Sequence, residues 1–112
     1  MKDVYGEITY KDKTYTLAFN LNVMEIIQEE YGTVGQWAEL TDKDEPDARA
    51  IIFGFKEMLN EGIDIDNEKN GTNDKPFTHK QVGRMITEIG LAETTMALKD
   101  TVINSTKDEK NA

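Results

Sequence analysis

The feature that most constrains the fold is a change in hydrophobic period near residue 20. Residues 3–19 alternate between apolar and polar positions, as strands do, and the polar run Lys11, Asp12 and Lys13 divides them into two segments. Beyond that point the apolar residues recur at helical spacing. We therefore predict an α+β fold, in which an N-terminal β-hairpin at residues 3–19 is followed by a small bundle of four to five helices.

Polar caps and glycines bound the stretches with helical spacing. Thr78 followed by Gln81 forms a capping box, and Asn22 followed by Glu25 resembles a second one. Gly62 is a natural helix terminator, because glycine enters the left-handed region without a Cβ clash. The predicted helices cover residues 22–31, 34–40, 46–61, 78–89 and 91–104.

The chain length and the polar segments set the domain organisation. With 112 residues, of which 38% are hydrophobic, the chain can build one core, so we predict a single domain over residues 1–104. Residues 62–75 are polar and rich in turn formers, which favours a mobile loop. Residues 105–112 are polar and are predicted to form a C-terminal tail.

The charge balance narrows the classes of partner. Thirteen Lys and Arg stand against 22 Asp and Glu, for a net charge of −9. Binding to nucleic acid or to an anionic membrane requires clustered basic residues, so neither partner is expected. The chain has no cysteine, one histidine and no apolar run long enough to cross a bilayer. We expect an acidic domain of the cytoplasm.

Few residues suggest catalysis or metal binding. Asp64, Asp66 and Glu68 resemble the start of an EF-hand, but the glycine and the final glutamate of that loop are not both in place. His79, the single histidine, lies beside a helix cap, and no nucleophile or phosphate-loop motif accompanies it. We expect no enzyme, no catalytic residue, no cofactor and no metal. A metal-dependent activity at the three acidic residues remains the enzyme hypothesis.

Three apolar residues are candidates for binding a protein partner. Phe53 lies opposite the apolar stripe of its predicted helix, so either another part of the chain covers it or it anchors an interface. Met96 and Ile103, with Ala92, form a second ridge on the last helix. That ridge fits either a buried terminal helix or a Met-containing groove for a partner helix.

Acidic residues concentrate in one part of the chain. Residues 22–47 contain eight carboxylates and one lysine, which gives 1 − 8 = −7 of the net charge. Such a concentration either keeps the protein soluble or forms an acidic rim that attracts a basic partner.

The order of elements resembles that of a phage family. Residues 13–19 read KTYTLAF, residues 22–32 read NVMEIIQEEYG, and residues 90–93 read GLAE. In these segments the chain resembles the small tail assembly chaperones of long-tailed bacteriophages and the related family of gene transfer agents. Such chaperones bind the long helical tape measure protein before the tail tube polymerises around it.

The resemblance implies a protein partner and no enzymatic activity. The expected partner is the tape measure protein, with the tail tube protein as a further one, and the expected place is the cytoplasm of the bacterial host. The alternative is a structural component of the phage tail or of the head–tail joint. An exposed hairpin edge could also pair with a second copy of the chain, which would give a homo-oligomer.

Overall fold

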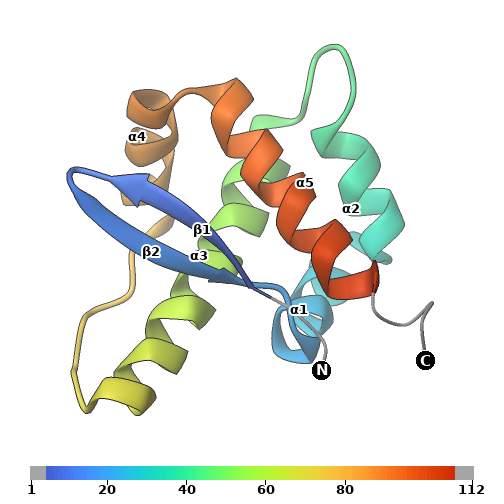
Figure 1. Cartoon of the computed structure of the whole chain (residues 1–112). Coiled ribbons are helices and arrows are strands. Elements are labelled where there is room, and N and C mark those ends of the chain that lie inside the picture. Colours follow the sequence, from blue (N-terminus) through green and yellow to red (C-terminus); the bar gives the residue numbers. More distant parts are fainter. Residues whose placement is uncertain (1–4, 108–112) are drawn as a thin grey trace.

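The alternating N-terminal segment forms an antiparallel hairpin in the computed structural model, which describes residues 5–107 and the side chains of residues 5–105 (Figure 1). Strand β1 (Tyr5–Tyr10) pairs with β2 (Lys13–Ala18), in a register that runs from Tyr5 opposite Ala18 to Tyr10 opposite Lys13. The two residues of the turn, Lys11 and Asp12, both have positive φ, at 50° and 66°. The predicted hairpin is therefore confirmed, with a turn of the kind that suits the twist of paired strands.

Helices follow the hairpin, as the change of period predicts, and the α+β class is confirmed. They are α1 (Leu21–Tyr31), α2 (Val34–Thr41), α3 (Ala48–Asn70), α4 (His79–Ile89) and α5 (Leu91–Lys107). Helix α3 packs against β2, and α5 packs against β1 (Figure 1). Leu17 and Phe19 are fully buried in the core. None of the helices in the described range is long and apolar enough to cross a bilayer.

The central helix α3 differs most from its predicted bounds. It begins after the cap Asp47, whose Oδ1 accepts a hydrogen bond from the Ala50 backbone N–H at 3.0 Å. It then continues through Gly62 to Asn70, so residues 62–70 are helical and do not belong to a loop. Gly62 was predicted to end the helix, and this is wrong, because it is a buried contact point between α3 and β2.

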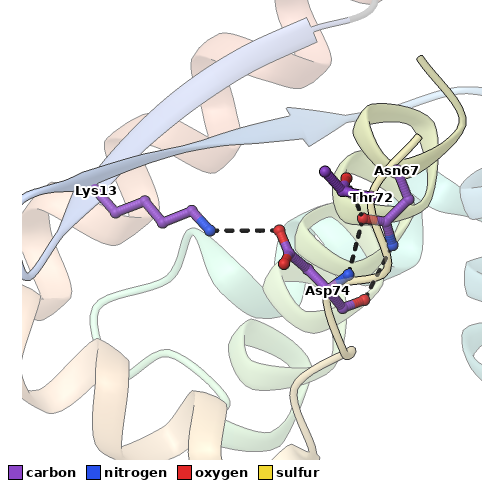
Figure 2. Close-up of polar contacts among 4 residues, drawn as sticks. All are labelled: Lys13, Asn67, Thr72 and Asp74. Atoms are coloured by element: carbon purple, nitrogen blue, oxygen red, sulfur yellow. Dashed lines mark hydrogen bonds and ion pairs between the residues drawn. The ribbon is translucent and has the colours of Figure 1, made fainter. Parts of the chain in front are cut away.

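Asparagine side chains hold the segment that follows α3. The Asn67 amide donates to the Asp74 carbonyl at 2.9 Å, and its Oδ1 accepts from the Asp74 N–H and the Thr72 hydroxyl (Figure 2). About two helical turns earlier in α3, the Asn60 amide donates to the Phe77 carbonyl at 2.9 Å, and its Oδ1 accepts from the Phe77 N–H at 2.8 Å. Asp74 and Phe77 belong to no helix or strand, so their backbone groups lack the usual backbone partners. The two asparagine side chains provide the hydrogen bonds instead.

The predicted caps are correct for one helix and displaced for another. Thr78 and Gln81 form both hydrogen bonds of the capping box at the start of α4. At α1, however, the cap is Asn20, whose side chain accepts from the Val23 N–H, so the prediction of Asn22 as the cap is wrong. Asn22 lies inside the first turn, and its amide reaches across to Glu61 of α3.

The end of the chain is more helical than its composition suggests. Helix α5 extends to Lys107, three residues beyond the predicted end at 104. Ser105, assigned to a polar tail by its sequence, is only 3% exposed. Its hydroxyl donates to the Val102 carbonyl at 2.8 Å, which satisfies it within the helix. The rest of the predicted tail, residues 108–112, lies outside the described residues.

Candidate functional site

Helix α5 packs on the hairpin through small polar residues. Thr94, Leu98, Thr101 and Ser105 follow one another at helical spacing, and each is at most 3% exposed. Three of these four side chains carry a hydroxyl group. A polar stripe on the inner face is the reverse of the usual pattern, in which apolar residues face the core.

Close packing explains why the side chains on the inner face of α5 are small. A Cβ built on Gly6 of β1 would come within 3.0 Å of the Thr101 hydroxyl, so strand and helix meet where the strand has no side chain. The Thr101 hydroxyl donates to the Ala97 carbonyl at 2.8 Å, whereas the buried Thr94 hydroxyl has no hydrogen-bond partner in the described part of the chain. Bulky apolar residues would not fit at this contact.

The outward face of α5 also carries apolar residues. Met96 is 63% exposed and Ile103 is 49% exposed, and Ala92 is exposed one turn before Met96. We call these three residues the α5 ridge. The sequence left two interpretations of these residues, a buried terminal helix or a surface for a partner helix. Because Met96 and Ile103 are exposed, the first interpretation is wrong for this face. The α5 ridge is an outward apolar surface of the kind that partner helices use.

Charged residues border the α5 ridge. Lys99 lies between Met96 and Ile103, and its Nζ is 3.2 Å from the Asp42 carboxylate in the segment after α2. This ion pair connects α5 to the acidic stretch 22–47, whose carboxylate side chains are exposed apart from the half-buried Asp47. The α5 ridge and the acidic stretch therefore adjoin each other at Asp42.

Phe53 is not part of this surface. It is 9% exposed and belongs to the core, with its ring 5.5 Å from that of Tyr31 in α1, edge to face. Lys56 also contacts the ring, with Nζ 5.5 Å from the ring centre. Because Tyr31 covers the ring, this second face of α3 is also buried at Phe53. The prediction of Phe53 as a partner-binding residue is wrong for this reason.

The candidate metal residues do not form a site. Asp64, Asp66 and Glu68 lie on α3, where a helix replaces the loop that an EF-hand requires. No cluster of three or more potential metal ligands occurs among residues 5–107. His79 is exposed at the first position of α4, as expected for a surface histidine.

Sequence reasoning missed one exposed apolar residue near the α5 ridge. Leu91 is 50% exposed and is the first residue of α5. Because no earlier turn of the helix lies over it, its side chain is left uncovered. The preceding Gly90, with φ of 110°, is the sequence signal that separates α4 from α5 at this point.

Comparison with known proteins leaves the family open. No protein-family model, no curated protein and no solved structure matches the chain. We therefore base a function on the α5 ridge, its acidic border and the resemblance seen in the sequence.

Proposed function

We propose that this protein is a tail assembly chaperone of a phage or prophage, which keeps the helical tape measure protein soluble until the tail tube assembles. The observation that carries this proposal is the outward α5 ridge, with Met96 at 63% exposure. Long helical chains carry apolar faces that aggregate when they are left uncovered. A chaperone for them needs an apolar surface together with enough charge to keep the complex in solution.

The two parts of the surface would have different roles. The α5 ridge would take the apolar face of a tape measure helix, and the flexible Met96 side chain could adapt to different residues. The acidic stretch 22–47 would attract basic residues of the partner and raise the association rate. Binding would take place in the bacterial cytoplasm, without catalysis, cofactor, nucleic acid or membrane. The tail tube protein is a further candidate partner.

Coexpression with a tape measure fragment from the same phage tests the proposal. The chain should raise the soluble yield of that fragment. Met96→Glu should lower the yield and weaken the purified complex about tenfold, because a charge would face the apolar helix. Thr87→Glu is the matched control, since it adds the same charge at an exposed position of α4, outside the α5 ridge and the acidic stretch. Circular dichroism should show that both variants fold.

Two results would contradict the proposal. If Met96→Glu and Ile103→Glu both fold and both keep the fragment soluble, the α5 ridge is not the binding surface. If the unaltered chain does not raise the soluble yield, the chaperone function itself is refuted. Phe53→Glu cannot serve as a test, because a charge at a position only 9% exposed would unfold the domain.

A structural role in the phage tail or head–tail joint is the second candidate, and the hairpin favours it. The sheet within the described residues has two strands, and α3 lies on the outward backbone carbonyl of Thr16 in β2, so β1 is the strand that a second copy could extend. Strand pairing of this kind can join copies of a chain into rings. Mass spectrometry of purified virions distinguishes the two functions, because a structural protein is retained in the particle and a chaperone is absent from it.

A further inference from the structure

A groove of about 220 Å³ lies between α1 and the second half of α3. The α3 side contributes three carboxylates, from Glu57, Glu61 and Asp64. No lysine, arginine or histidine is among the described residues that line it. Helix α5 does not contribute to the lining, so this groove and the α5 ridge are separate surfaces.

The other side of the groove is apolar. Val23 and Ile26 of α1 and Pro76 from the segment before α4 line it. Val23 is buried and Ile26 is half-buried, so they form a floor rather than a rim. An apolar floor with carboxylates along one edge suits a ligand that is itself amphipathic, with an aliphatic part and a positive end.

One of the carboxylates is held in place from α1. The Asn20 and Asn22 amides both donate to Glu61 Oε2, at 2.7 Å and 3.0 Å. Asn20 Oδ1 also accepts a hydrogen bond from the Val23 N–H as the cap of α1, and this bond fixes the orientation of the Asn20 side-chain NH2 group. Oε1 of Glu61 takes part in no hydrogen bond with a described residue. A carboxylate fixed in this way can accept a further donor without losing side-chain entropy.

The spacing of the carboxylates indicates the class of cation. Glu57, Glu61 and Asp64 follow one another at i, i+4 and i+7, which extends over roughly 10 Å along the helix axis. A metal ion needs its oxygen ligands within about 2.6 Å of one centre, so this row does not suit one. A lysine or arginine side chain is long enough to lie along the row and carries several hydrogen-bond donors.

We propose that the α1–α3 groove binds a lysine or arginine side chain of a partner protein. The aliphatic stem lies on Val23, Ile26 and Pro76, and the cationic end donates to Glu61 and Asp64. No basic residue lines the groove among the described residues, and Lys56 outside it pairs with Glu57, with 3.4 Å between Nζ and Oε2, so Glu61 and Asp64 are the carboxylates left for a cation. Charge complementarity at these two residues selects this occupant. The inference goes beyond the chaperone function and does not depend on the identity of the partner.

Two synthetic helical peptides provide the test. One carries a single arginine flanked by leucines, and the other has citrulline, which is neutral and of nearly the same shape, in its place. Titration followed by NMR should shift the side-chain amides of Asn22 and Asn60 with the arginine peptide only. Glu61→Gln and Asp64→Asn should each weaken binding at least about fivefold. Glu68→Gln is the control, since it removes the same charge from α3 outside the groove.

Two outcomes would overturn the inference. Equal binding of the citrulline peptide would show that charge is not recognised. Equal weakening by Glu68→Gln and Glu61→Gln would show a general attraction to an acidic protein. Asp64→Asn keeps the test valid if Glu61→Gln disturbs the start of α1, because Asp64 makes no hydrogen bond with a described side chain. The coexpression experiment with Met96→Glu is unaffected by either outcome, so the two proposals fail separately.

Discussion

The carbonyl oxygen of Thr16 in β2 lies where a side chain on Gly62 of α3 would begin. A Cβ built on Gly62 would come within 3.0 Å of this oxygen and of the Thr16 carbonyl carbon. Both groups belong to backbone, so neither can turn away as a flexible side chain could. The glycine thus allows α3 to lie directly on the strand, and it keeps the helix continuous at a position that is fully inside the protein.

Gly62→Ala is therefore expected to destabilise the fold. The added methyl group would force α3 and β2 apart, at a cost of roughly 1–3 kcal/mol in the free energy of unfolding. Gly83→Ala in α4 is the matched control, because the nearest atom to its Cβ is the end of the Ile52 side chain at 3.5 Å. That control should be neutral or stabilising by up to about 1 kcal/mol, as alanine favours helix. Urea denaturation of both variants measures the difference. Equal stability would show that the two backbones do not meet closely at Gly62.

Gly62 also shows which part of the fold could be predicted from the sequence. Local signals were sufficient for the hairpin and for the capping box of Thr78 and Gln81, because the interacting groups are neighbours along the chain. A glycine has the same local signature at a helix end and at a close tertiary contact. Only the position of β2, which comes more than 40 residues earlier in the chain, decides between the two.

The hairpin turn offers a stabilising substitution. Asp12 has φ of 66°, a conformation that costs most residues energy and that glycine adopts freely. Turns of this kind prefer glycine at their second position. Asp12→Gly should raise the free energy of unfolding by roughly 0.5–1 kcal/mol, and Asp12→Val should lower it, since β-branched residues tolerate positive φ poorly. Thermal denaturation monitored by circular dichroism checks both. If the valine variant is as stable as the glycine variant, the turn does not have this geometry.

The Asn67 side chain controls the segment after α3. It makes three hydrogen bonds, one to Thr72 and two to the backbone of Asp74. Asn67→Ala would remove all of them and should cost about 1–2 kcal/mol. Hydrogen exchange at the Asp74 amide should become much faster, while exchange in the core of α3 should change little.

Asn70→Ala is the control for this effect. Asn70 is exposed at the end of α3 and its side chain makes no hydrogen bond with a described residue, so the change should stay within about 0.5 kcal/mol. Equal exchange rates at Asp74 in the two alanine variants would mean that the segment is ordered without Asn67. The sequence could not indicate this, because its many turn-forming residues favour a loop whether or not a side chain fixes it.

The candidate site was also only partly predictable. Met96 and Ile103 form an exposed ridge distinct from the buried side of Leu98, as their spacing predicts, while their role in partner binding stays a prediction. Phe53 was chosen by the same helical geometry, but it is buried because Tyr31 of α1 covers it. The difference lies in the neighbours of each helix. Around Phe53, α3 is covered by other elements on both faces, whereas α5 packs through Thr94, Leu98, Thr101 and Ser105 and leaves Met96 and Ile103 exposed.

A hydrogen bond between the hairpin and α4 makes the stability depend on pH. The Tyr10 hydroxyl donates to Glu88 Oε1, which raises the pKa of Tyr10 above its ordinary value of about 10, with a smaller contribution from desolvation. The proton is therefore bound more tightly in the folded protein than in the unfolded chain. This contribution to stability is complete below about pH 10 and is lost as the pH rises through the higher folded pKa.

Tyr10→Phe should remove this pH dependence. Below about pH 10 the variant should unfold at a lower urea concentration than the unaltered protein, because it lacks the hydrogen bond. At higher pH the difference should shrink, since the unaltered protein then loses the same bond. Glu88→Gln provides the second measurement: the pKa of Tyr10, followed by carbon-13 NMR of its ring, should fall toward its ordinary value when the carboxylate is replaced. An unchanged pKa in Glu88→Gln would show that Glu88 does not hold the tyrosine proton.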